Sequence, residues 1–172
     1  MGVGGWSPWN LVAGGGCVGT VDLAAAVAVE LKRLPLVGSV VSVQPRSGWA
    51  LVNLDTIAYS DGAGQWLAAT VLGTDVVVRA VPVGYVWDFG DGSVPVVSTG
   101  PGAPYPHASI THQYRQEGTR TIVLTTTWRA DFQVVGSSTW EPVLGTATTR
   151  SASAPLRIYT AVPRLVADPV AP

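Results

Sequence analysis

After Pro35 the chain consists mostly of short apolar segments separated by turns rich in Gly, Asp and Pro. Residues alternate most clearly between Thr119 and Trp128, where Ile122 and Leu124 alternate with Thr121, Val123 and Thr125. Both the alternation and the regular turn spacing are typical of strands in a β-sandwich. The expected strands are 40–43, 49–54, 56–59, 65–72, 76–81, 84–87, 110–114, 119–128, 146–149 and 156–165. The pattern therefore predicts an all-β, antiparallel fold.

One segment, from about Val21 to Leu34, has helical periodicity. Its largest apolar residues fall on one stripe, at Leu23, Val27, Leu31 and Leu34. Thr20 is placed to cap the first turn and Pro35 to end the helix. We expect this helix to pack on the sandwich; the alternative is a helix that docks on another protein.

The composition excludes two classes of partner. Only 12% of the residues are charged, and the formal net charge is −1. Such a chain has no long-range field that would attract nucleic acid or an anionic membrane. No apolar run reaches the roughly 20 residues of a transmembrane helix.

The pattern divides the chain into four parts. Residues 1–19 form a flexible Gly-rich arm, 20–73 a helix and strands that pack on the sandwich, 74–166 the sandwich itself, and 167–172 a tail. Cys17 is the single cysteine, so no disulfide forms within the chain. Residues 1–19 lack the basic start of a secretory signal, and Gly14 does not suit a lipoprotein cleavage site.

Two motifs point to a known family. The run Tyr85-Val86-Trp87-Asp88-Phe89-Gly90-Asp91-Gly92-Ser93 resembles the W-D-F-G-D-G-S hallmark of PKD domains. Downstream, Thr111-His112-Gln113-Tyr114 and the segment 118–124 resemble the family's H-x-Y…G-x-Y-x-V-x-L region. The resemblance covers about residues 74–165 and implies an immunoglobulin-like sandwich.

The motif residues have structural explanations. Trp87 and Phe89 alternate on a strand, so both can face the core, and Gly90-Asp91-Gly92 forms a tight turn. Tyr114 is placed like a tyrosine-corner residue. The residues carried over from the family motif are Trp87, Asp88, Phe89, Gly90, Asp91, Gly92, His112, Tyr114 and Gly118.

The chain departs from the family pattern in two places. Arg120 stands where family members usually have an aromatic residue, and the segment 128–142 resembles an inserted β-hairpin around Gly136. The layout is also similar to that of secreted actinobacterial proteins that contain PKD domains. This resemblance implies an extracellular or cell-surface location and no known ligand. We expect an unidentified protein or polysaccharide as partner.

Asp88 and Asp91 are candidate calcium ligands, because they flank one turn and Asp75 can lie nearby. The alternative is that both carboxylates cap main-chain amides of the turn. His107 and His112 would point to opposite faces of a strand, so no zinc site is predicted. No other cofactor is expected.

Seven tryptophans exceed the number that one sandwich core needs. Those at Trp49, Trp66, Trp128 and Trp140 are candidates for an exposed surface that binds a sugar or a protein. The alternative is that they pack the helix and the inserted hairpin onto the sandwich.

The chain contains no motif of a hydrolase elbow, a zinc protease or a phosphate loop. Asp55 and Asp61 are candidates for a pair of catalytic carboxylates, but capping of turn amides explains both residues. We therefore predict a noncatalytic extracellular interaction or spacer module. One alternative is a carbohydrate-binding accessory domain, which needs a coplanar, exposed tryptophan pair. Another is a fragment of a secreted hydrolase, which needs a cleft with a histidine beside a carboxylate or nucleophile.

Overall fold

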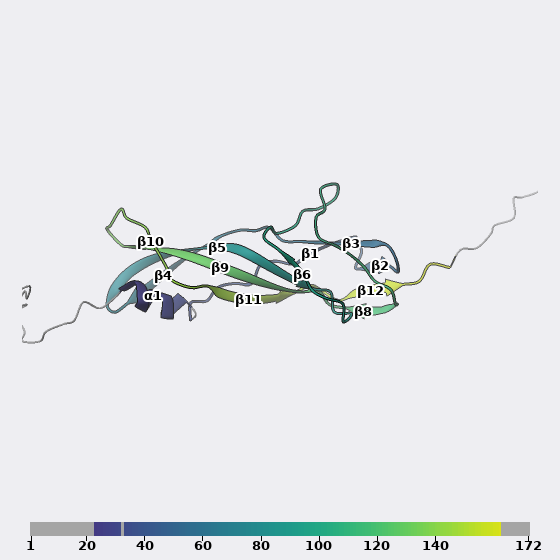
Figure 1. Cartoon of the computed structure of the whole chain (residues 1–172), viewed down its shortest axis with the longest axis horizontal. Coiled ribbons are helices and arrows are strands. Elements are labelled where there is room, and N and C mark those ends of the chain that lie inside the picture. The colour runs from purple at the N-terminus through teal and green to yellow at the C-terminus, as the bar shows by residue number, and fades with distance from the viewer. Residues whose placement is uncertain (1–22, 32, 163–172) are drawn as a thin grey trace, which may run out of the picture.

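The computed structural model describes residues 23–31 and 33–162 (Figure 1). The expectations for the Gly-rich arm, Cys17, the Thr20 cap and the tail from residue 167 lie outside the described residues. In chain order the elements are α1 (Leu23–Leu31), β1 (Ser42–Gln44), β2 (Trp49–Leu51), β3 (Asp55–Tyr59), β4 (Gln65–Val71), β5 (Thr74–Asp88), β6 (Val96–Ser98), β7 (Thr111–Gln113), β8 (Gly118–Arg120), β9 (Val123–Val134), β10 (Glu141–Pro142), β11 (Ala147–Ala152) and β12 (Leu156–Tyr159).

Within the described residues, the strands form three sheets. The largest has the order β10-β9-β5-β4, with β11 also paired to β9 and β6 to β5. Two smaller sheets have the orders β1-β3-β7 and β2-β12-β8. The molecule is elongated, with α1 and β4 towards one end and β8 and β12 towards the other (Figure 1). The predicted all-β, immunoglobulin-like sandwich with a single helix is confirmed.

Among the described residues, the buried apolar side chains form two cores. The sandwich core consists of Ala50, Ala58, Tyr85, Trp87, Phe89, Ile110, Tyr114, Ile122, Leu124, Leu156 and Ile158. The helix-side core consists of Val27, Val71, Val76, Val78, Ala80, Trp128, Ala130, Phe132, Val143 and Ala147. Val27 on α1 belongs to the second core, so the helix packs on the large sheet as expected.

The long strands β5 and β9 run through both cores. On β9 every second residue from Leu124 to Phe132 is buried, so the even-numbered residues face the core along the whole strand. On β5 the parity changes, because Val78 is buried in the first half and Trp87 in the second. The register of the pair shifts between Pro82 and Gly84, where one extra residue forms a β-bulge. Because of this bulge, the buried residues of both halves of β5 lie on the same face of the sheet as the buried residues of β9.

Several details differ from the sequence prediction. The pairing of β12 with β2 is parallel, so the sandwich is not entirely antiparallel. The described helix ends at Leu31, ahead of the predicted end at Leu34, and the amides of Arg33 and Leu34 both donate to the Glu30 carbonyl in a closing turn. Strand β6 lies between the expected strands 84–87 and 110–114, where the sequence pattern predicted no strand.

The segments 76–81 and 84–87 are one strand, because a bulge accommodates Pro82 without ending the pairing. The hairpin expected in 129–140 is the continuation of β9 followed by a turn and β10. Strands β4 and β5 pair across residues 72–73, and β3 pairs with β7. Strands on both sides of residue 73, where the sequence analysis placed a division, therefore share sheets.

Candidate functional site

The hallmark motif builds the sandwich core. Trp87 and Phe89 are both buried, and the indole Nε1 of Trp87 donates to Ser98 Oγ at 3.4 Å. Tyr114 is fully buried, and its hydroxyl donates to the Phe89 carbonyl at 3.1 Å. Burial raises the pKa of the Tyr114 phenol, so this hydroxyl stays a donor. The Tyr114 hydroxyl thus forms a hydrogen bond with a main-chain carbonyl, as expected of a tyrosine corner.

The two motif aspartates accept main-chain hydrogen bonds within the turn. Asp88 Oδ1 accepts from Gly90 N at 2.9 Å, and Asp91 Oδ1 accepts from Ser93 N at 3.1 Å. The second oxygen of Asp91 lies 2.7 Å from His112 Nε2. Burial alone would raise the pKa of Asp91, but hydrogen bonds from Ser93 and His112 outweigh it and lower the pKa to about 2.

The calcium site stays a prediction. In the part of the chain that the structure describes, no group of three or more His, Cys, Asp or Glu side chains is arranged to hold a metal. Both oxygens of Asp91 already have protein partners. A calcium ion at this turn would therefore displace His112 or use main-chain carbonyls.

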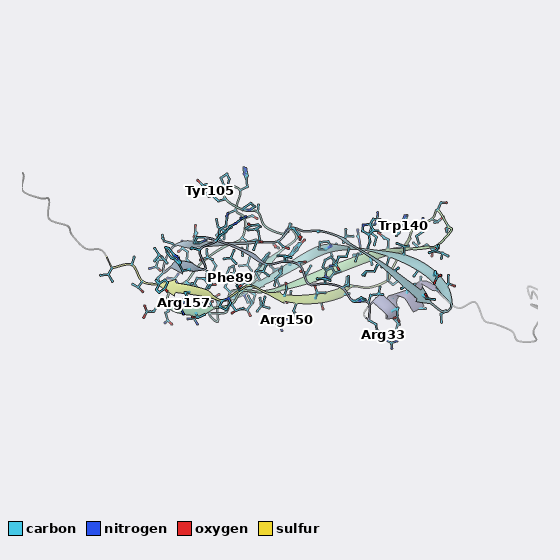
Figure 2. The ribbon with its side chains drawn as sticks, turned by 180° about the vertical axis from the view of Figure 1, so that it is seen from behind. Arg33, Phe89, Tyr105, Trp140, Arg150 and Arg157 are labelled. Carbon is cyan, nitrogen blue, oxygen red and sulfur yellow. The ribbon has the colours of Figure 1, made fainter. Side chains whose placement is uncertain are left out.

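The histidines do not lie together in a site. His112 is fixed by Asp91 and stacks on Phe89, with ring centroids 4.3 Å apart. His107 is exposed in the loop before β7, where its amide donates to the Pro104 carbonyl. This loop projects from the molecule, with Tyr105 near its tip (Figure 2).

His112 beside Asp91 meets one condition of the hydrolase alternative, and the pair lies on the wall of a hollow of about 290 Å³. Ser93 is the serine on the same wall, but His112 Nε2 pairs with Asp91 rather than with the Ser93 hydroxyl. A serine nucleophile needs a hydrogen bond to the base that takes its proton. The arrangement therefore lacks the contact that would activate Ser93.

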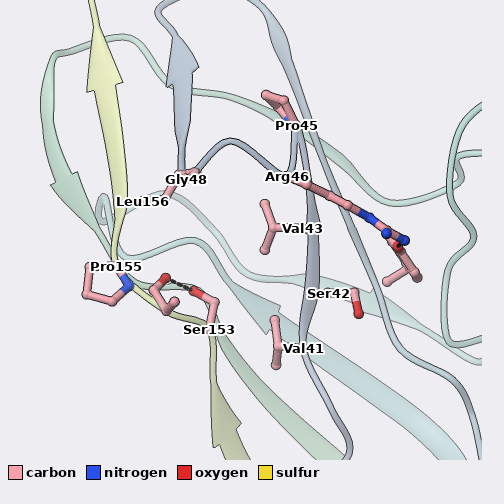
Figure 3. Close-up of a pocket in the computed structure, with 11 residues that line it drawn as sticks. Val41, Ser42, Val43, Pro45, Arg46, Gly48, Ser153, Pro155 and Leu156 are labelled. Carbon is pink, nitrogen blue, oxygen red and sulfur yellow. Dashed lines mark hydrogen bonds between the residues drawn. The ribbon is translucent and has the colours of Figure 1, made fainter.

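A second hollow, of about 260 Å³, runs along β1 (Figure 3). It is lined by residues 41–43, 45, 46, 48, 59 and 153–156, so it contains no histidine, cysteine or carboxylate. Arg46 donates to the Tyr59 hydroxyl at 3.4 Å, and Ser153 Oγ donates to the Ala154 carbonyl at 2.8 Å. The lining offers no general acid–base pair of the usual kind.

The four candidate tryptophans do not form one surface. Trp128 is 1% exposed in the helix-side core, and its Nε1 donates to Thr149 Oγ1 at 2.8 Å, so its expected place on a binding surface is wrong. Trp128 is buried because it is one of the alternate residues of β9 that point to the core beneath α1. Trp49 is exposed on β2, in edge contact with Tyr159.

Trp66 and Trp140 come together on the outer face of the large sheet. Trp66 is 63% exposed, and its ring meets that of Trp140 edge to face at 5.6 Å and 75°. Arg79 lies over the Trp140 ring at 5.0 Å and pairs with Asp131 at 2.9 Å. Trp140 and Arg33 lie on opposite sides of the large sheet (Figure 2). We call the four residues Trp66, Arg79, Asp131 and Trp140 the tryptophan face.

Register explains how the tryptophan face forms. Trp66 on β4 is opposite Arg79 on β5, and Arg79 is opposite Asp131 on β9. The three side chains therefore form one row across the sheet, and the cation–π contact of Arg79 holds Trp140 over this row. A guanidinium held between a carboxylate and an indole is a fixed polar centre within an aromatic surface.

Sequence reasoning missed Arg79 and Asp131. The signal for Arg79 was present, since a tight turn at Leu72-Gly73 makes Trp66 and Arg79 cross-strand neighbours. The contact of Asp131 had no such signal, because β9 is far from β5 in the sequence.

The fold is an immunoglobulin-like β-sandwich, extended by a helix-covered half. Residues 56–130 match the family model of the PKD domain, so the PKD resemblance is confirmed for this part of the chain. The match begins at β3, earlier than the resemblance at 74–165 indicated, and ends within β9. No curated protein and no solved structure matches the chain.

PKD domains are typically extracellular. Among the described residues, no helix has the length and apolar character needed to cross a membrane.

Proposed function

We propose that the chain is a noncatalytic, extracellular interaction and spacer module, and that it binds a protein partner through the tryptophan face. The observation that carries the proposal is the contact of Trp66 and Trp140 with an arginine that is already oriented by Asp131. Tryptophan and arginine are the residues most enriched among the energetic centres of protein interfaces. The elongated shape supports the role of a spacer, because it sets α1 and β12 at opposite ends (Figure 1).

The carbohydrate-binding alternative has weaker support. A pair of indoles that stacks on successive sugar rings needs coplanar rings, whereas Trp66 and Trp140 meet at 75°. Trp66 alone offers one exposed ring. A polysaccharide partner is therefore kept as an outcome of the test.

The test compares immobilised wild-type chain with Trp66→Ala and with Trp49→Ala as matched control, since Trp49 is an exposed tryptophan of the β2-β12-β8 sheet. Each is exposed to extracellular proteins of the source cells and to cellulose, chitin and β-glucan. We expect Trp66→Ala to weaken binding of the partner about thirtyfold, the effect of an interface hot spot, and Trp49→Ala to leave it unchanged. Equal retention by all three chains would contradict the proposal, and Trp66-dependent retention of a polysaccharide alone would favour the carbohydrate-binding alternative.

A further inference from the structure

The hollow beside His112 lies away from the tryptophan face and has a different chemistry. Its volume is about 290 Å³, and its wall consists of residues 91–93, 112–116 and Arg120. These residues come from the hallmark turn, from β7 and the turn after it, and from the end of β8. The walls are therefore held by the sandwich core directly beneath them. We call this hollow the arginine pocket.

The single carboxylate on the wall of the arginine pocket is already occupied. Asp91 accepts from Ser93 N and contacts His112 Nε2, and its lowered pKa keeps it ionised. The nearest other acidic residues in the sequence, Asp88 and Glu117, are not part of the wall. Asp88 is held by the amide of Gly90.

Two guanidinium groups on the wall have no such partner. The ion pairs formed among the described residues involve Arg33, Arg79 and His112, but neither Arg115 nor Arg120. Arg115 is exposed, and Arg120 is half-buried over Gly118, where an added Cβ would lie 3.8 Å from its guanidinium carbon. The wall therefore has an excess of positive charge.

One donor of the Arg120 guanidinium lacks an acceptor. Arg120 Nε is hidden from solvent without a hydrogen-bond partner. Leaving buried donors unpaired costs free energy that an incoming acceptor would recover. An arginine fork matches the paired oxygens of a carboxylate or a phosphate, so this wall suits an anion of that kind.

We propose that the arginine pocket binds a carboxylate-bearing sugar, such as one uronic acid residue of an acidic polysaccharide. Arg115 and Arg120 would hold the carboxylate, and the side-chain amides of Gln116 and of Gln113, which also donates to Asp55, provide polar groups for sugar hydroxyls. The volume is close to the lower limit of small-ligand sites, which suits a single sugar ring. An acidic peptide is disfavoured, because β7 and β8 each have three residues and offer little edge for strand addition.

The experiment follows main-chain amide signals of the whole chain by NMR during titration with glucuronate, glucose, acetate and a glutamate-rich peptide. We expect glucuronate to shift the signals of residues 91–93 and 112–120, and glucose to leave them in place. Arg115→Gln and Arg120→Gln should each weaken glucuronate binding about tenfold or more, as expected for a lost charge-assisted hydrogen bond. Arg150→Gln is the matched control, since Arg150 is an exposed arginine on β11.

Several outcomes would overturn the proposal. The first is that glucuronate causes no shifts at tens of millimolar. The second is that acetate binds equally well, which would mean that the sugar ring is not recognised. The third is that the peptide binds more tightly than glucuronate. Arg115→Gln changes an exposed side chain and so keeps the test valid if Arg120→Gln fails to fold. Thermal unfolding of both variants distinguishes lost binding from lost structure.

Discussion

At the scale of single residues, the hallmark turn depends on how closely its main chain approaches the rest of the sandwich. Gly90 and Gly92 both have positive φ, of 72° and 81°. A Cβ added to Gly90 would lie 2.6 Å from the Thr121 carbonyl oxygen, whereas one added to Gly92 would meet nothing within 4 Å. The two glycines therefore share a conformational requirement and differ in a steric one.

This difference gives a matched pair of substitutions. Gly92→Ala should lower the free energy of unfolding by about 1 kcal/mol, the cost of positive φ for an L-residue. Gly90→Ala should lower it by more than about 2 kcal/mol, because a main-chain clash adds to that cost. Urea unfolding followed by tryptophan fluorescence measures both values, and equal losses would show that the approach to Thr121 does not matter.

At the scale of elements, the bulge in β5 decides which side chains are buried. Val83 is the extra residue between the two halves of the strand, and its side chain is 39% exposed. Without it, Tyr85 and Trp87 would change faces relative to Val78 and Ala80. A one-residue change in register moves every following side chain to the other face of a strand.

Deleting Val83 should therefore abolish the folded state, since Tyr85 and Trp87 would leave the sandwich core. Val83→Ala is the control, and because the side chain is partly exposed it should change stability by no more than about 1 kcal/mol. Near-ultraviolet circular dichroism and thermal unfolding report the outcome. A deletion variant that melts like the wild type would mean that β5 re-registers elsewhere.

The same strands show how far sequence reasoning reaches. Turn chemistry and alternation were enough to place most strands, because both depend on neighbours within a few residues. The family motif indicated the burial of Trp87 and the corner position of Tyr114. Which tryptophans are exposed depends instead on strand parity and on pairing between distant segments. Trp128 therefore could not be assigned to the core, nor Asp131 to the tryptophan face, before the pairing of β9 with β5 was known.

At the scale of the whole molecule, the two cores share strands and so form one folding unit. Residues 56–130, which match the family model, contain only part of each core. The sandwich core would lose Ala50, Leu156 and Ile158, and the helix-side core would lose Val27 and Phe132 among others. A fragment of this length would leave the facing side chains exposed to water.

We therefore expect the isolated fragment 56–130 to show no cooperative thermal transition. The chain 23–162 is the control, because it contains every residue of both cores, and it should melt in a single transition. Circular dichroism and differential scanning calorimetry distinguish the two. A cooperative transition in the short fragment would contradict the idea that the cores depend on each other.

The continuity of β5 and β9 also restricts how such a protein can change during evolution. A residue inserted into one of these strands alters the register with both of its neighbours, so it persists only if the partner strand lengthens or a second bulge absorbs it. The helix-covered half therefore cannot be gained or lost as a separate structural unit. Its length and that of the half built around the sandwich core must be inherited together, as one matched set of strands.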